Sequence, residues 1–339
     1  MGNCHSKNEL DTSNSISKSS FDFIKPIGRG AIGKVWRAIH TKTKQQIAIK
    51  TFTKSEIPSR ETLNSILRER IILSLLQHPF IINIQFAFED RSKLYLGLDL
   101  KLGGDLRFHL LKRKFSEPEV KVILGCIILS LEYVHSRRII HKDVKPENII
   151  LDSNGYAFLT DFGTSSVYKE ENSHENSGTP GYMAPEVICR QNHSFVSDFF
   201  ALGVILFECI TGTRPYRGKN RKEIRDGILE RQVKILEENR PEEWSIEAVE
   251  ICNLLLKRKP SQRLGKDGVE SLMKHAWFKD FDFEALRRFE VKPKFVPSGS
   301  DNFDAEHVGF SRKVRIKEKL TNKDFEGYFF SPFNRIQEI

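Results

Sequence analysis

The first structured part of the chain alternates hydrophobic and polar residues with a period of two. Phe21 to Gly28, Lys34 to His40 and Gln45 to Phe52 each follow this pattern. Such alternation predicts half-buried strands, because successive side chains of a strand point to opposite faces of a sheet. One helix is predicted around Arg60 to Gln77. Residues 21–98 are therefore expected to be rich in strands.

Helical spacing dominates from about Leu102 to Phe281. Ser116-Glu-Pro-Glu119 is a capping box with proline in the first turn. Ser197 to Thr211 is nearly all apolar and is followed by Gly212, a stop signal, which predicts a buried central helix. The hydrophobic residues behind the capping box recur at helical spacing and predict one buried stripe: Val120, Ile123, Leu124, Ile127, Leu131 and Val134.

Composition narrows the class of protein only a little. The 339 residues suffice for one large core or two modest ones, and 39% hydrophobic with 29% charged residues is ordinary for a globular protein. The net charge of +9 is spread along the chain and fits a solvated basic surface, an acidic partner or an anionic membrane. No nucleic-acid-binding motif is present, so no nucleic acid partner is expected. Five scattered cysteines without metal spacing indicate reduced thiols in the cytosol.

The N-terminus carries an acylation signal. Met1-Gly2-Asn3-Cys4-His5-Ser6 fits the pattern for N-myristoylation of Gly2. A single myristoyl chain anchors weakly, and Cys4 is placed to supply a second signal by palmitoylation. Residues 1–20 are expected to be a disordered segment that holds the chain at the cytosolic face of a membrane as a peripheral protein. The alternative is a disordered tail in which the glycine is accidental. No secretory leader or membrane-spanning run is seen.

Two short polar runs carry the candidate chemistry. His141-Lys-Asp143-Val-Lys145-Pro-Glu147-Asn148 is followed thirteen residues later by Asp161-Phe-Gly163. They supply a proton acceptor, a lysine, an amide oxygen and a second carboxylate on two nearby loops. Phosphoryl transfer needs these groups, because a hydroxyl must be oriented and Mg²⁺ must be held against a triphosphate.

A glycine-rich turn precedes these loops. Gly28-Arg29-Gly30-Ala-Ile-Gly33-Lys-Val35 matches G-x-G-x-x-G, which fits a dinucleotide-binding turn equally well. A Rossmann turn should open a helix, whereas two predicted strands follow here and the second ends in Ile47-Ala48-Ile49-Lys50. A glycine-rich hairpin followed by a strand that carries a lysine is the arrangement found in protein kinases.

Together these motifs resemble the eukaryotic protein kinase family over residues 21–281. The resemblance implies an α+β, bilobal protein kinase-like fold with a β-rich small lobe (21–98), a helical large lobe (102–281) and an extended tail (282–339). Segments of the tail and large lobe resemble the AGC group and, within it, the YANK branch: Phe295-Val-Pro297, Asn302-Phe303-Asp304, Leu102 to Leu110, Arg214-Pro-Tyr216 and Phe330-Ser-Pro-Phe333-Asn334-Arg335.

The resemblance implies a role for each residue of the two loops. Asp143 would orient the substrate hydroxyl and accept its proton, and Lys145 would neutralise the transferring phosphoryl group and reach Thr179. Asn148 and Asp161 would hold Mg²⁺. ATP and Mg²⁺ are therefore the expected cofactors, and proteins with serine or threonine hydroxyls the expected partners.

The same resemblance implies the nucleotide site. Lys50 would contact the α- and β-phosphates of ATP and pair with Glu69. Leu98 would guard the back of the adenine pocket. The other nucleotide-binding residues would be Ile27, Gly28, Arg29, Gly30, Gly33, Val35, Ala48, Asp99, Leu100, Ile150 and Thr160.

Acidic residues predict the choice of substrate. Asp105, Glu147 and Glu208 match positions that receive arginines upstream of the target serine in related kinases, and paired carboxylates suit this purpose. Pro180 and Met183 would form an apolar pocket for the next residue. The expectation is a serine/threonine kinase whose substrates carry upstream arginine.

Further residues are implied as structural partners. Glu186 would pair with Arg263, Asp198 would brace the catalytic loop, and Phe303 would close the nucleotide pocket. A column that links the lobes would comprise Leu73, Ile84, His141 and Phe162.

The chain departs from the family at two linked positions. Lys142 replaces an arginine, and Glu175 replaces a phosphorylatable threonine in the activation loop. One carboxylate needs only a point charge, whereas a phosphate suits an arginine fork. The hypothesis is that this pair replaces the phospho-switch; the alternative is a flexible loop that has drifted.

The tail motif departs as well. Phe330-Ser-Pro-Phe333 precedes Asn334 rather than a phosphosite, and a second register is Phe325-Glu-Gly-Tyr328. Glu306 stands where some relatives carry tyrosine. Docking of the tail would then rest on aromatic burial alone.

Two other functions compete with an active kinase. A pseudokinase scaffold at a membrane is disfavoured because Lys50, Asp143 and Asp161 are all present. A small-molecule kinase would not carry Ala184-Pro-Glu186. A monomer is expected; the physiological substrate, pathway and upstream activator do not follow from the sequence.

Overall fold

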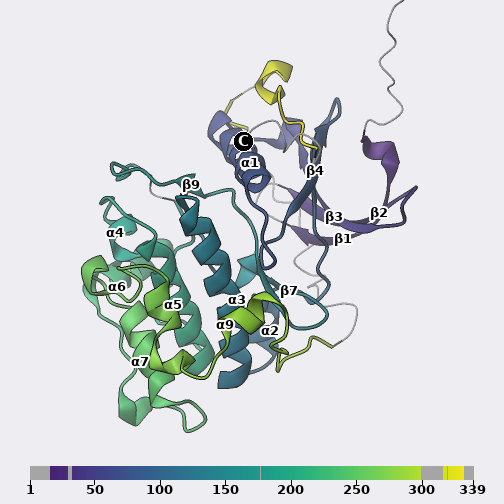
Figure 1. Cartoon of the computed structure of the whole chain (residues 1–339). Coiled ribbons are helices and arrows are strands. Elements are labelled where there is room, and N and C mark those ends of the chain that lie inside the picture. Colours follow the sequence, from purple (N-terminus) through teal and green to yellow (C-terminus); the bar gives the residue numbers. More distant parts are fainter. Residues whose placement is uncertain (1–15, 30–32, 176, 299–315, 319, 332–339) are drawn as a thin grey trace, which may run out of the picture.

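The computed structural model describes residues 16–29, 33–175, 177–298, 316–318 and 320–331. It has two lobes, with a strand-rich lobe formed by the first hundred residues and a larger helical lobe below it (Figure 1). The α+β, bilobal fold is thereby confirmed. Several predicted positions lie outside the described residues: Gly2, Cys4, Gly30, Phe303, Glu306, Phe333 and Asn334.

The small lobe is built on one antiparallel sheet. Its five strands follow the order β1-β2-β3-β5-β4. The three strands expected from alternation are present; the bounds of β2 are as predicted, and those of β1 and β3 differ from the prediction by one residue. The strands are β1 (Phe21–Arg29), β2 (Lys34–His40), β3 (Gln46–Thr53), β4 (Ile84–Glu89) and β5 (Lys93–Leu98).

Helix α1 (Arg60–Leu75) packs on this sheet. It begins after Ser59, whose hydroxyl accepts a hydrogen bond from the Thr62 amide at 3.3 Å, as an N-cap serine does. Its inner face buries Leu63, Ile66 and Ile72 among other residues. Helix α1 thereby holds the buried side chain of Glu69 toward the sheet.

The large lobe is centred on two long helices. Helix α3 (Glu117–Ser136) begins with the predicted capping box, in which the Ser116 amide donates to Glu119 at 2.8 Å. Helix α5 (Val196–Thr211) is almost fully buried and ends at Gly212, whose φ of 71° is left-handed and favours glycine. The other helices are α2 (Leu106–Lys112), α4 (Pro185–Ile188), α6 (Arg221–Glu230), α7 (Ile246–Leu255), α8 (Glu270–Met273) and α9 (Phe283–Arg287).

Two short strand pairs carry the loops between the lobes. Strand β6 (Ile139–Ile140) pairs with β9 (Ser166–Val167), and β7 (Ile149–Leu151) pairs with β8 (Ala157–Leu159). The run 141–148 therefore leaves β6 and enters β7, while Asp161 follows β8 directly. Pairing of β7 with β8 brings the two polar loops side by side.

Two implied structural pairings are confirmed. Arg263 donates to both carboxylate oxygens of Glu186 at 2.7 and 2.9 Å, and both side chains are buried. The members of the expected column are also buried, and the rings of His141 and Phe162 lie 4.8 Å apart in an edge-on arrangement. Leu73 and Ile84 belong to the same core as Phe162.

Two segments are more regular than the sequence indicated: one lies within residues 1–20, expected to be disordered, and the other lies within the tail, expected to be extended. A 3₁₀ turn covers Lys18–Ser20, and the Ser20 carbonyl accepts from the Thr41 amide at 2.9 Å, which joins the turn to the residue after β2. Helix α9 lies in the part expected to be extended, since Asp282 caps it by accepting from the Ala285 amide at 2.8 Å.

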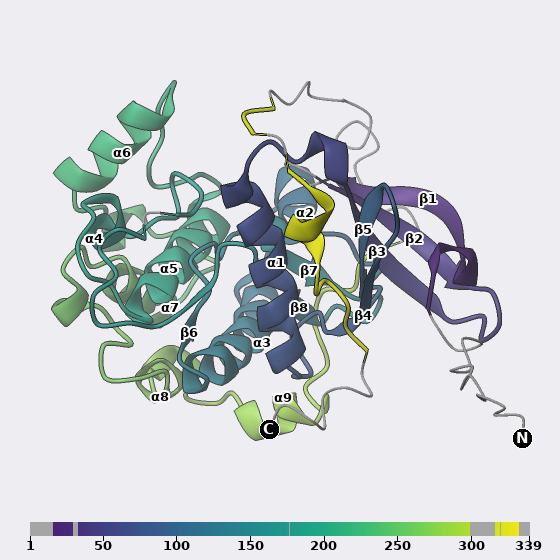
Figure 2. The same cartoon turned by 90° about the horizontal axis from the view of Figure 1, so that it is seen from above.

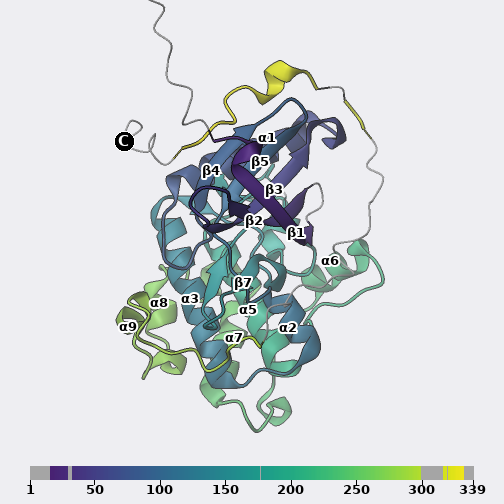
Figure 3. The same cartoon turned by 90° about the vertical axis from the view of Figure 1, so that its right-hand side faces the viewer.

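Beyond α9 the tail contacts both lobes. It first runs toward α2, where the Phe295 ring lies 5.0 Å from that of Phe115 (Figure 3). The segment 320–331 then lies beside α1 and β4 of the small lobe (Figure 2). There Phe330 exchanges two backbone hydrogen bonds with Ala87 of β4, at 2.9 and 3.0 Å. The described parts of the tail thus contact both lobes.

Of the two tail registers, only the second lies wholly within the described residues. Phe325 and Tyr328 are buried, whereas Phe329 is 53% exposed. Phe330 is also buried, while its partner in the first register lies outside the described residues. Within the described part of the chain, no helix is long and apolar enough to cross a membrane.

Candidate active site

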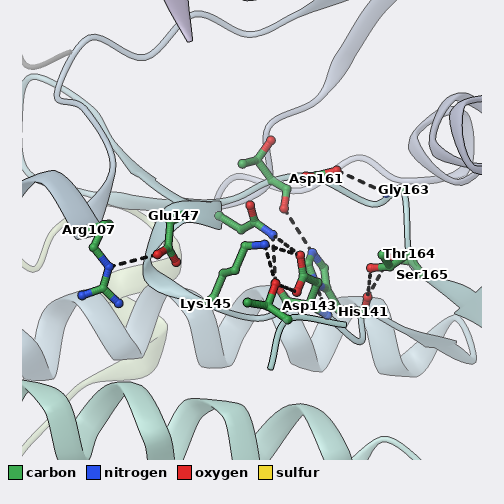
Figure 4. A network of polar contacts seen from close by, with 12 residues as sticks. Arg107, His141, Asp143, Lys145, Glu147, Asp161, Gly163, Thr164 and Ser165 are labelled. Atoms are coloured by element: carbon green, nitrogen blue, oxygen red, sulfur yellow. Dashed lines mark hydrogen bonds and ion pairs between the residues drawn. The ribbon is translucent and has the colours of Figure 1, made fainter. Parts of the chain in front are cut away.

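Asp143 lies at the centre of the polar loop between β6 and β7. One oxygen of its carboxylate accepts from the Lys145 ammonium at 2.6 Å, and the other accepts from the Thr179 hydroxyl at 2.7 Å. Lys145 also donates to the Thr179 hydroxyl oxygen at 2.7 Å. The three side chains form a closed triangle, and Figure 4 shows Asp143 and Lys145 facing one another. Asp143, Lys145 and Thr179 are thus brought together, as the sequence predicted.

Asn148 completes this group from the 3₁₀ turn Pro146–Asn148. Its side-chain nitrogen donates to the Asp143 carbonyl at 2.9 Å and to the Asp143 carboxylate at 3.1 Å. Both bonds use the nitrogen, so the amide oxygen stays available as an acceptor or metal ligand. The Thr160 amide donates to the Asn148 carbonyl at 3.0 Å and ties this loop to the one that bears Asp161.

Asp198 of helix α5 holds the loop from below. Its carboxylate accepts from the backbone amides of His141 and Lys142, at 3.0 and 2.8 Å. His135 of α3 contacts the same carboxylate at 2.8 Å. Although burial opposes it, the hydrogen bond from His135 lowers the pKa of Asp198, which keeps the carboxylate charged. The expected bracing of the loop by Asp198 is confirmed.

Lys50 joins the small lobe to the metal loop. Its ammonium donates to both oxygens of Glu69 on α1, at 2.7 and 2.9 Å, and lies 3.6 Å from Asp161. Burial alone would lower the pKa of Lys50, but the two carboxylates raise it, so this lysine remains charged. In turn, Lys50 lowers the pKa of Asp161. The predicted pairing of Lys50 with Glu69 is confirmed.

The residues expected around adenine lie on adjacent strands. Ala48 of β3 is directly opposite Leu98 of β5, and Val35 of β2 is opposite Lys50. Gly33 needs its missing side chain, because a Cβ there would lie 2.8 Å from the Thr51 carbonyl oxygen. Of the predicted nucleotide-binding set, Ile27, Gly28, Arg29, Asp99, Leu100, Ile150 and Thr160 are described and Gly30 is not.

Some polar groups of Asp99, at the junction of the lobes, already have hydrogen-bond partners within the protein. The Asp99 amide donates to the Asn83 carbonyl at 3.1 Å, and its carboxylate accepts from Gln85 at 2.5 Å. The carbonyl of Asp99 is therefore the group of this residue that remains for an adenine edge. The roles predicted for Asp99 and Leu100 stay predictions.

The acidic residues predicted to bind substrate differ in their surroundings. Asp105 caps α2 by accepting from the Phe108 amide at 2.8 Å, and burial raises the pKa of its carboxyl group. Glu147 and Glu208 lie close together, but Arg107 binds both, at 3.0 Å and at 2.6 and 2.9 Å. The expectation that these two carboxylates are open to a substrate arginine is therefore corrected.

Sequence reasoning missed this arginine. Arg107 stands inside the run Leu102 to Leu110, and a second arginine, Arg214, approaches Glu147 at 3.5 Å and Glu208 at 3.8 Å. Both were quoted only as marks of family resemblance. The available signal was an arginine two positions after Asp105, within a run expected to flank the substrate site.

The activation loop contains the predicted carboxylate–lysine pair. The Lys142 ammonium donates to Glu175 at 2.5 Å, and the Ser166 hydroxyl donates to the same oxygen at 2.6 Å. The Lys142 side chain is only 2% exposed. Contact between Glu175 and Lys142 is therefore present, while its effect on activity stays a hypothesis.

The pocket predicted for the residue after the target is only outlined. Met183 packs against the core next to Gly178, whose φ of 138° is strained for any side chain. A Cβ at Gly178 would lie 2.8 Å from the Lys142 carbonyl oxygen. The role of Pro180, which follows Thr179, stays a prediction.

The residues present fit a magnesium nucleotide. Asp161 is 44% exposed and provides one carboxylate, and Asn148 provides one amide oxygen. Among the described residues no group of three or more His, Cys, Asp or Glu could hold a metal alone. Mg²⁺ is commonly bound by one or two protein oxygens together with substrate phosphates, so two protein ligands suffice.

Comparison with known proteins shows to which family the chain belongs and which proteins it is similar to. A model of the protein kinase domain matches residues 21–278. The chain is 36% identical over 333 residues to a probable serine/threonine-protein kinase of Dictyostelium discoideum, covering 96% of this chain and 72% of the relative. It is 37% identical to protein kinase 2 of the same organism (85% and 60% covered) and 39% identical to human ribosomal protein S6 kinase alpha-3 (83% and 38% covered). The chain thus spans well under half of that last relative.

Proposed function

This chain belongs to the protein kinase family and is of the serine/threonine class, and we propose that it phosphorylates protein hydroxyls with Asp143 as proton acceptor. The observation that carries the proposal is the Asp143 carboxylate held between Lys145 and Thr179. Kinases of this family use ATP with Mg²⁺. Bound Mg²⁺·ATP supplies the transferable phosphoryl group and the cation that offsets its charge.

Different side chains orient the substrate hydroxyl, neutralise charge and hold the phosphates and the metal. Asp143 orients the substrate hydroxyl and takes up the proton that it loses. Lys145, already within hydrogen-bond distance of Asp143, neutralises negative charge that develops beside it. Lys50, fixed by Glu69, would hold phosphate oxygens, and Asp161 with Asn148 would hold the metal.

Thr179 supports a preference for serine and threonine hydroxyls. Its hydroxyl donates to Asp143 and accepts from Lys145, so it closes the site on the side of the activation loop. A substrate hydroxyl that approaches Asp143 must therefore fit beside this contact. A short side chain brings its oxygen to that point close to its own backbone, whereas the tyrosine hydroxyl lies a ring further out.

The pseudokinase alternative has less support. A scaffold need not keep a charged Lys50 paired with Glu69 while Asp161 faces the same ammonium at 3.6 Å. Nor need it keep the Asp143 carboxylate in contact with three side chains that donate hydrogen bonds to it. These contacts support catalysis over a purely structural use of the fold.

We further propose that Glu175 takes the place of a phosphorylated activation-loop residue. A phosphate in this position would pair with a cation at the start of the catalytic loop. Glu175 makes such a pairing with Lys142, whose amide is bound in turn by Asp198. The activation loop is thus linked to Asp143 through adjacent residues of one chain.

Membrane attachment through Gly2 and Cys4 is a separate proposal. Its support is the M-G-x-x-x-[ST] pattern with an adjacent cysteine. Acylated protein should sediment with liposomes, and Gly2→Ala should release it into the supernatant.

Catalytic and nucleotide residues all come from one chain, which supports action as a monomer; light scattering on a sizing column tests that point.

The deciding experiment measures phosphate transfer from Mg²⁺·ATP to serine peptides by unphosphorylated protein. Asp143→Asn should reduce the rate by a factor of about 10² or more, since general-base assistance contributes about 10²–10⁴. Asp161→Ala is the second control, because it removes a metal ligand and leaves Asp143 in place. Transfer that persists at the same rate in both variants would refute the proposed roles.

A further inference from the structure

Arg107 occupies a set of acceptors next to the reaction centre. Its two terminal nitrogens bind the two oxygens of Glu208 at 2.6 and 2.9 Å, and its Nε binds Glu147 at 3.0 Å. One terminal nitrogen also donates to the Tyr182 hydroxyl, which itself donates to Glu208 at 3.1 Å. The guanidinium group of Arg107 is therefore hydrogen-bonded along more than one of its edges.

The position of this cluster ties it to substrate binding. Glu147 lies between Lys145 and Asn148 in sequence, and Tyr182 follows Thr179 by three residues. Figure 4 shows Arg107 and Glu147 beside the Asp143–Lys145 contact. In a peptide whose hydroxyl reaches Asp143, a side chain upstream of that hydroxyl would have to extend toward Arg107 in order to contact Glu147 and Glu208.

Burial makes the arrangement tight. The side chain of Arg107 is 13% exposed and that of Glu208 is 10% exposed. Charge-assisted bidentate pairs of this kind are the strong ones, and removing one partner leaves a buried charge. Arg107 is attached to the same chain, so it competes with a substrate arginine without loss of translational freedom.

Charge around the cluster is nearly balanced. Arg107 and Arg214 face the carboxylates of Glu147 and Glu208, and Asp105 interacts electrostatically with Arg107 and Glu147. Three carboxylates against two guanidinium groups leave a single net negative charge. One oxygen of Glu147 has no hydrogen-bond partner among the described residues. A strongly acidic site for a basic peptide is therefore absent from this part of the described structure.

Resting on the proposed function, we propose that Arg107 is a built-in occupant of the arginine subsite formed by Glu147 and Glu208. The kinase then does not require an arginine at the peptide position that would reach these two residues. Its substrate class shifts to serine and threonine sites with neutral residues there. Recognition of an upstream arginine narrows to the carboxylate of Asp105.

Peptide pairs that differ by one residue test the proposal. Each pair carries Arg or Ala at one of the positions two to six residues before the serine, and both kcat/KM and Kd are measured. Wild type should distinguish Arg from Ala by less than about threefold at every position except one read by Asp105. Arg107→Met should raise the Arg preference by about tenfold or more at one further position, because two carboxylates are freed.

Matched variants separate the subsite from general damage. Arg214→Met removes the same charge from a more exposed arginine, whose nitrogens lie 3.5 and 3.8 Å from Glu147 and Glu208, so it should change the preference by less than threefold. Arg107→Met combined with Glu208→Gln removes the buried charge as well and should cancel most of the gain. If Arg107→Met folds poorly, wild type beside Glu208→Gln tests the idea, because wild type should have no Arg preference at this subsite for Glu208→Gln to remove.

Several results would overturn the proposal. One is a wild-type preference of tenfold or more for Arg that Glu208→Gln abolishes; another is an unchanged preference in Arg107→Met. Kd for the peptide pairs, measured by fluorescence anisotropy without turnover, decides the matter even if no transfer occurs. Absence of transfer to every peptide would instead count against the proposed catalytic function.

Discussion

The pair formed by Glu175 and Lys142 gives the sharpest test of how this enzyme reaches its active state. Glu175→Ala leaves the Lys142 ammonium, 2% exposed, without its 2.5 Å partner. Breaking a buried pair from one side costs about 3–5 kcal/mol. Because 20% of the Glu175 side chain is exposed to water, the cost should fall just below that range, and we expect the unfolding free energy to fall by about 2–3 kcal/mol.

The loss of activity follows from the same contact. If the pair holds the activation loop against the catalytic loop, a penalty of about 2–3 kcal/mol reduces the competent population by about 30- to 150-fold. Lys142→Met should cost less stability, since Glu175 keeps its hydrogen bond from Ser166 at 2.6 Å. The double variant should be more stable than the sum of the two single changes predicts, by about 1–3 kcal/mol of coupling.

The assay uses phosphatase-treated protein whose phosphorylation state is checked by mass spectrometry. Denaturant unfolding gives the three stability changes, and initial rates with a fixed peptide give kcat/KM. Glu175→Gln is the matched variant, because it keeps two polar atoms and removes only the charge. The reasoning is refuted if Glu175→Ala keeps kcat/KM within twofold, or if activity of the wild type depends on phosphate at Ser173 or Ser177.

Three further changes test the surrounding structure. Tyr328→Phe should raise the unfolding free energy by about 1 kcal/mol in a denaturant titration, because the buried Tyr328 hydroxyl has no partner among the described residues; a decrease would mean that the hydroxyl is hydrogen-bonded. Burial, and then Arg287 and Arg137, lower the pKa of His78 to about 4, so unfolding should take up a proton between pH 6.5 and 4. Stability should therefore fall by at most about 3 kcal/mol as the pH drops through that window, and a His78→Asn variant that keeps the full pH slope would contradict this assignment. Arg263→Met should cost about 3–5 kcal/mol by leaving buried Glu186 unpaired, measured by the same titration, and a loss below 1 kcal/mol would show that the pair is dispensable.

Local rules account for much of what the sequence predicted correctly. Strand bounds followed from alternation, and the start of α3 followed from the capping box at Ser116, because both depend on neighbours within a few residues. The catalytic loop was recognisable because its side chains are fixed by short spacing. Pairings such as Lys50 with Glu69 were implied by family resemblance rather than by any local pattern.

Other features depend on contacts that local rules do not reach. Arg107 and Glu208 lie 101 residues apart in sequence, and only the packing of α2 near α5 brings them together. Two tail registers had equal aromatic patterns, and the choice between them depends on which rings fit the small lobe. In three dimensions Phe325, Tyr328 and Phe330 are buried while Phe329 is exposed, a difference that the aromatic pattern alone does not give.

The backbone pairing of Phe330 with Ala87 has a consequence for solubility. Strand β4 is the last in the order β1-β2-β3-β5-β4, so one of its sides is an open sheet edge. Open edges invite pairing with strands of other molecules. The tail takes part of this edge through the hydrogen bonds at 2.9 and 3.0 Å. It therefore shields the small lobe from edge-to-edge aggregation, and protein shortened before residue 316 should aggregate sooner on storage than the full chain.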